Sequence, residues 1–129
     1  MQYEINDDRV DADHRLILQL LESFVSLPDD SGRETVLEFL GKIKEHVVVH
    51  FVDEEFIFEK ELRMPADYVT LHKQEHEKIR DRVLSAISSF QDGEGADMRA
   101  TVSAIRSDMV NHIEMIDSQM VPYAARKRS

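Results

Sequence analysis

The sequence lacks cysteine and tryptophan and contains few glycine and proline residues. Without cysteine, the 129-residue chain has no disulfide framework and no thiolate metal site, so histidine and carboxylate side chains would have to hold any transition metal. Four glycines and three prolines supply few helix breakers. The abundant Leu, Glu, Lys, Arg and Ala residues therefore predict long helices with a few well-marked breaks.

Basic residues are also scarce: the chain has 16 Lys and Arg but 26 Asp and Glu, which gives a net charge of −10. Such a chain lacks the basic surface that nucleic acids require, so we expect no nucleic-acid partner. The basic cluster at 124–129 is predicted to be a solvated tail. The N-terminus does not resemble a signal peptide and no apolar run could span a bilayer, which predicts no membrane association and a cytoplasmic location.

Apolar residues recur at helical spacing through most of the chain, and the breaks divide it into four segments. The predicted helices cover residues 12–27, 32–62, 67–90 and 97–121. Four helices with short connections favour an all-α fold, an antiparallel up-down-up-down four-helix bundle, with residues 1–129 forming a single domain.

Specific residues mark the predicted helix ends. Asp11 or Asp13 could cap the start of the first helix, and Ser31 with Glu34 has the spacing of a capping box at the start of the second. Pro122 is expected to end the fourth helix.

Each predicted helix carries at least one of the six histidines. His72 and His76 are four residues apart, as are His50 and Glu54, so the side chains of each pair can converge on one point. A lone histidine is usually a surface or hydrogen-bonded core residue. Histidines and carboxylates on four helices, however, could meet inside the bundle, where their burial without a metal would be costly.

The motifs resemble a known family in both order and spacing. The segments VDADHRLI at 10–17, HFVDEE at 50–55, HKQEH at 72–76 and HIEMID at 112–117 are similar to those of the hemerythrins, especially the bacterial members. The resemblance extends from about Val10 to Met120. Because one motif falls in each helix, the match is specific.

This resemblance implies a di-iron centre bridged by an oxo or hydroxo group. It assigns His72, His76 and His112 to one iron, His14 and His50 to the other, and Glu54 and Asp117 as bridges. With octahedral irons, this ligand set leaves one position open on the iron that has two histidines. The implied function is reversible O2 binding there, for storage, delivery or sensing rather than enzymatic turnover, with NO or azide-like anions as other possible ligands.

The expected walls of the O2 pocket are apolar: Ile17, Phe51, Met109 and Ile113. An apolar wall admits O2 and discourages water. Met109 stands where the family usually has leucine, and methionine is longer, more flexible and open to oxidation.

Helical geometry by itself leaves other ligands open. His112 and Asp117 are five residues apart, roughly 140° around a straight helix, so Asp117 requires local unwinding or a π-type turn. Asp108 fits the helical period better, as a ligand or as an acceptor for an imidazole N–H. Asp53 competes with Glu54, and His46 lies on the same face as His50.

Three other functions are compatible with a helical bundle. A ferritin-type oxidase, peroxidase or ferroxidase would use Glu-rich ligation with ExxH motifs, and no histidine here follows a glutamate at that spacing. A mononuclear bundle, with zinc for example, would use only part of the donor set. An interaction bundle with accidental histidines would be equally stable with and without metal.

Overall fold

The computed structural model describes residues 8–28, 30–91 and 98–128. The helices are α1 (Asp8–Val25), α2 (Arg33–Phe56), α3 (Ala66–Gln91), α4 (Met98–Met115) and α5 (Val121–Arg128). A π-helical segment, η1 (Ile57–Glu61), continues α2, and a 3-10 segment, η2 (Asp117–Met120), joins α4 to α5. These ranges contain no strand, which confirms the predicted all-α fold.

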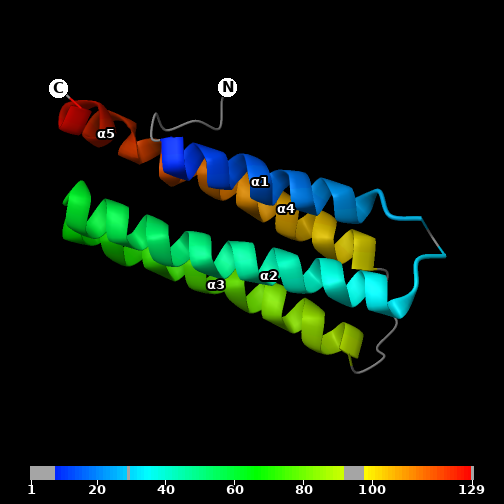
Figure 1. Cartoon of the computed structure of the whole chain (residues 1–129). Coiled ribbons are helices and arrows are strands. Elements are labelled where there is room, and N and C mark those ends of the chain that lie inside the picture. The colour runs from blue at the N-terminus through cyan, green and yellow to red at the C-terminus, as the bar shows by residue number, and fades with distance from the viewer. Residues whose placement is uncertain (1–7, 29, 92–97, 129) are drawn as a thin grey trace.

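Helices α1 to α4 form a four-helix bundle in which successive helices run in opposite directions (Figure 1). Helix α1 packs against α2 and α4, and α3 packs against the same two helices. Each of the four helices therefore turns one face toward the interior. No helix in the described part of the chain has the length and apolar character needed to cross a membrane.

The interior consists of two apolar clusters with a polar layer between them. The larger cluster includes Leu21, Val47, Val83 and Val102, and the smaller one is formed by Val10, Ile57, Phe58, Met64, Tyr68 and Met120. On each helix, buried polar residues occupy the turn between the two clusters. On α1, for example, His14 lies between Val10 and Ile17, and all three are buried.

The first two helices start differently from the prediction. Helix α1 begins at Asp8, so Asp11 and Asp13 lie inside the helix and neither caps it. The expected capping box at Ser31 and Glu34 is wrong, because the N-cap is Gly32, which makes no side-chain hydrogen bond. Ser31 therefore lies one position outside the cap.

The C-terminal segment also differs from the prediction. Pro122 does not end the fourth helix, which stops earlier at Met115. It is the second residue of α5, where proline is tolerated because its missing N–H would have no helical acceptor. The segment predicted as a basic tail, 124–129, belongs to α5 as far as Arg128, and Ser129 lies outside the described residues.

Candidate metal centre

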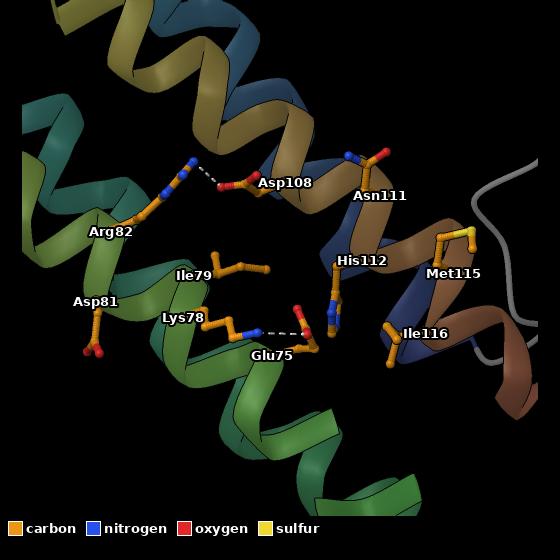
Figure 2. A pocket seen from close by; sticks show the side chains of 10 residues that line it. All are labelled: Glu75, Lys78, Ile79, Asp81, Arg82, Asp108, Asn111, His112, Met115 and Ile116. Carbon is orange, nitrogen blue, oxygen red and sulfur yellow. Dashed lines mark hydrogen bonds and ion pairs between the residues drawn. The ribbon is translucent and has the colours of Figure 1, made fainter. Parts of the chain in front are cut away.

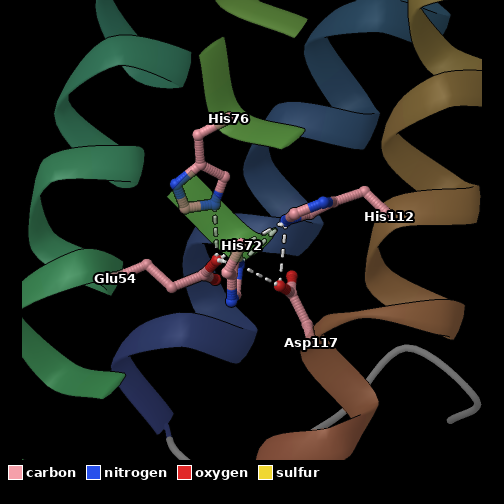
Figure 3. A group of neighbouring side chains, drawn as sticks. All are labelled: Glu54, His72, His76, His112 and Asp117. Carbon is pink, nitrogen blue, oxygen red and sulfur yellow. Dashed lines mark hydrogen bonds and ion pairs between the residues drawn. The ribbon is translucent and has the colours of Figure 1, made fainter. Parts of the chain in front are cut away.

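The polar layer between the two apolar clusters brings together all seven residues that the sequence singled out as ligands. They are His14, His50, Glu54, His72, His76, His112 and Asp117, and each is at most 4% exposed. They form two groups that share Glu54. One group contains Glu54, three histidines and Asp117 (Figure 3), and the other contains His14, His50 and Glu54. In each group the donor atoms lie within 4.8 Å of one another.

Glu54 presents one carboxylate oxygen to each group. Its Oε1 lies 2.8 Å from His72 Nε2 and 3.0 Å from His76 Nε2. Its Oε2 lies 3.0 Å from His50 Nε2 and 3.2 Å from His14 Nε2. The carboxylate thus lies between the group with three histidines and the group with two.

Asp117 has the same double orientation. Its Oδ1 lies 2.8 Å from His72 Nε2 and 3.0 Å from His112 Nε2, and its Oδ2 lies 3.0 Å from His14 Nε2. Asp117 therefore also faces both groups, from the side of the bundle formed by α4 and η2.

A break in the fourth helix places Asp117 in the interior. Helix α4 ends at Met115, and Ile116 stays in the helical region but with a widened φ of −109°. The chain then continues as the 3-10 segment that starts at Asp117. The five-residue spacing from His112 required such a break. The Tyr68 hydroxyl donates a 2.8 Å hydrogen bond to the carbonyl of Ile116 and ties the break to α3.

The competing candidates lie outside both donor groups. Asp108 is ion-paired with Arg82 at 2.5 Å across the groove between α3 and α4 (Figure 2). Asp53 is exposed and His46 is half-buried, and neither belongs to a donor group. The structure therefore separates these three residues from the donors.

Two histidines are oriented by carboxylates that the sequence analysis did not assign to the site. His50 Nδ1 lies 3.2 Å from Asp13 Oδ2, and His76 Nδ1 lies 2.9 Å from Glu55 Oε2. Donation of the Nδ1 hydrogen leaves the Nε2 lone pair directed at the site, which is the usual arrangement of ligating histidines. Asp13 lies in the VDADHRLI motif and Glu55 in the HFVDEE motif. Their spacing did not indicate these contacts, because each contact joins different helices.

Aromatic rings cover two of the imidazoles. Phe51 stacks on His76, with 3.9 Å between ring centroids and 10° between planes, and Phe58 stacks on His72 at 4.2 Å and 16°. Stacking restricts rotation of both imidazoles. The expected O2-pocket residues Ile17, Phe51, Met109 and Ile113 all belong to the larger apolar cluster, and each is at most 2% exposed.

Mutual electrostatics dominate the protonation of the site. Burial disfavours the charged form of His14 and His112, but Asp117 and Glu54 outweigh burial and raise the pKa of both imidazoles to about 10. Burial also opposes ionisation of Glu54, yet the neighbouring histidines hold its pKa below the usual range. Protons therefore supply the positive charge that balances the two carboxylates.

Several buried donor atoms lie close together without the hydrogen-bond geometry that burial normally requires. Both carboxylate oxygens of Asp117 and the Nε2 of His50 lie 2.8 to 3.0 Å from other site atoms. Among the described residues, none of these contacts forms a hydrogen bond. The Nε2 atoms of His72 and His112 face each other at 3.1 Å. Nitrogen and oxygen donors converging in this way fit a first-row transition metal cation.

Two openings lead toward the donor groups. A groove of about 670 Å³ between α3 and α4 has His112 among its lining residues (Figure 2). A second opening of about 500 Å³ between α1 and α2 is lined in part by His50 and Glu54. The first opening therefore reaches His112 of one group, and the second reaches His50 of the other.

The fold and the site define a histidine- and carboxylate-rich metal-binding four-helix bundle. Residues 6–124 match the family described as "Hemerythrin HHE cation binding domain", and the chain belongs to this family. It is similar to a bacteriohemerythrin of Methylococcus capsulatus (strain ATCC 33009 / NCIMB 11132 / Bath), with 26% identity over 121 residues that cover 94% of this chain and 90% of the relative. No solved structure gives a significant match.

Proposed function

We propose that the chain binds O2 reversibly at a non-haem di-iron centre inside the bundle. The observation that carries this proposal is the orientation of the Glu54 and Asp117 carboxylates. Each presents one oxygen to the first donor group and its other oxygen to the second. Two carboxylates in this arrangement can bridge a pair of metal ions. Membership of the hemerythrin family favours iron as the metal.

In this proposal each donor group would hold one iron. His72, His76 and His112 would be ligands of the first, His14 and His50 would be ligands of the second, and Glu54 and Asp117 would contribute to both. The iron pair would supply the two electrons needed to bind O2, and the smaller number of histidines in the second group would leave room there for O2, NO or an azide-like anion.

The chain's own residues keep the donors in position and the site dry. Asp13 holds the imidazole of His50 from the surface side, so that its Nε2 stays directed at the site. Ile17, Met109 and Ile113 supply the apolar wall that discourages water. These features suit a protein for oxygen storage, delivery or sensing.

Anaerobic loading with ferrous iron tests the proposal directly. We expect two irons per chain and a visible absorption band that appears with O2 and disappears when O2 is removed. His50→Ala and Glu54→Gln should abolish the reversible band. Asp108→Asn, which changes an acid that lies outside both donor groups, should retain it.

The same experiment separates the competing functions. One metal per chain would contradict the di-iron centre and favour a mononuclear site. Oxidation by O2 that cannot be reversed would instead indicate a redox enzyme.

A further inference from the structure

Helix α2 carries an apolar stripe on its outer face. Val49, Val52 and Phe56 are 54%, 63% and 58% exposed. Their spacing of three and four residues places them on one side of the helix. Neighbouring exposed apolar side chains of this size are typical of a surface that contacts another protein.

Charged residues of opposite sign extend this stripe with mirrored spacing. Glu45 precedes Val49 by four residues, and Lys60 follows Phe56 by four residues. Both are exposed. Val49 is three residues before Val52, and Phe56 is three residues after Asp53. The stripe is therefore symmetric about its centre, with an acid at one end and a base at the other.

This symmetry makes the surface complementary to itself. If two α2 helices pack antiparallel across a two-fold axis, Glu45 lies opposite Lys60 of the second copy, and Val49 lies opposite Phe56 of the second copy. In this register Val52 lies opposite Asp53 of the second copy, and the two Val52 side chains lie next to the axis. One patch pairing with the same patch is the geometry of a closed dimer.

We propose that the outer face of α2 and of η1, which contains Lys60, is a homodimer interface from Glu45 to Lys60. Within one chain the two charged residues are 15 positions apart, roughly 22 Å along a helix, so they cannot pair with each other. A contact between single helices buries a small area, so we expect a weak dimer that dissociates on dilution. The interface does not depend on the proposed metal centre.

Sedimentation velocity of the full chain, from micromolar to millimolar concentration, provides the first test. We expect dimer to accumulate as concentration rises. Val52→Glu, which places two like charges beside the axis, should give monomer throughout. Leu84→Glu, at a 39% exposed apolar position on α3, should dimerise as the parent does. Circular dichroism checks that both variants remain helical. Monomer at every concentration of the parent, or dimer in Val52→Glu, would overturn the proposal.

Exchange of the two charges tests the antiparallel register. Glu45→Lys alone and Lys60→Glu alone each place like charges opposite one another and should weaken the dimer. The double variant restores opposite charges and should regain the parent's dimer fraction. Failure of the double variant to recover while it remains folded would rule out this register.

A disulfide test uses the absence of cysteine in the natural chain. Val52→Cys places its thiol beside the axis, so the mild oxidant diamide should link two copies rapidly, with two thiols losing two electrons and two protons to the oxidant. Leu84→Cys is the matched control and should link slowly. Equal rates for the two variants would contradict the proposed contact.

Discussion

The Tyr68 hydroxyl donates a hydrogen bond of 2.8 Å to the backbone carbonyl of Ile116 and so joins α3 to the point where α4 ends. Ile116 comes directly before Asp117, whose carboxylate faces both donor groups. The same carbonyl also accepts the Gln119 N–H at 3.1 Å, so two hydrogen bonds hold it at the break. Tyr68 therefore stabilises the backbone geometry that directs Asp117 into the interior.

Tyr68→Phe should loosen the position of Asp117 while retaining most of the packing of the aromatic ring. We expect the free energy of unfolding to fall by about 1 kcal/mol, because one partly buried hydrogen bond is lost while the carbonyl keeps its bond from the Gln119 N–H. Metal should also leave several-fold faster when the loaded protein is challenged with a chelator. Denaturant titration and the rate of metal release measure the two effects.

A matched change at another hydrogen bond separates position from general stability. Ser118→Ala removes a hydroxyl hydrogen bond to the Glu114 carbonyl near the same break, but that bond is exposed and joins residues only four positions apart. Faster metal release in Tyr68→Phe than in Ser118→Ala is the expected result. Equal release rates would show that the Tyr68 hydroxyl does not position Asp117.

Asp13→Asn and Glu55→Gln should each weaken metal binding by about 10- to 100-fold, because each removes the charge of the acceptor that orients a histidine. Asp13 acts on His50 and Glu55 acts on His76. Competition with a chromophoric chelator measures the affinity. Asp53→Asn, which changes an exposed neighbour of Glu54, should have no comparable effect. Unchanged affinity in the first two variants would show that their contacts are incidental.

The fold was predictable because the helices are long and strongly periodic. Few glycines and prolines interrupt the chain, and apolar residues such as Leu21 and Val83 recur on the faces that became the core. Helix ends were predicted less well, because short-range signals compete there. Ser31 and Glu34 have the spacing of a capping box, yet the extended backbone of Gly32 places the cap one residue later.

At the candidate site, the sequence predicted residues that converge along one helix but not contacts between different helices. His72 and His76 are one turn apart, so the sequence alone indicated that they converge. Asp117 departs from the helical period, and only the resemblance to a family selected it over Asp108. Asp13 and Glu55 could not be predicted, because their histidine contacts join residues 37 and 21 positions away on other helices.

The metal-free protein should lose stability as the pH rises from 6.5 to 10. His14 and His112 have pKa values of about 10 in the folded chain against an ordinary value of 6.5. Folding therefore stabilises their protonated forms, and this contribution is fully present below pH 6.5 and disappears as the pH rises through 10. The melting temperature of the metal-free chain across this range measures the loss.

Substitution of one histidine in the site and one outside it tests the source of this pH dependence. His112→Gln should flatten it, whereas His46→Gln should leave it unchanged.

Loading the parent with metal should release protons, because the cation replaces them beside Glu54 and Asp117. A pH indicator in weakly buffered solution detects this release. A melting temperature independent of pH in the metal-free parent would contradict the raised pKa values of His14 and His112.

Met109 should report where oxidising species arise. Its side chain is fully buried three residues before His112, whereas Met115 is 68% exposed. Hydrogen peroxide added to the metal-free protein should therefore oxidise Met115 first, because a reagent from solution reaches the exposed sulfur. Repeated cycles of O2 binding and removal in the iron-loaded protein should raise the proportion of sulfoxide at Met109, because the oxidant then forms inside the bundle. Peptide mass spectrometry distinguishes the two positions. Met109→Leu, which nearly conserves volume and should cost less than about 1.5 kcal/mol, should withstand more cycles before reversible binding is lost. Oxidation confined to Met115 under both conditions would show that Met109 does not line the site where O2 binds.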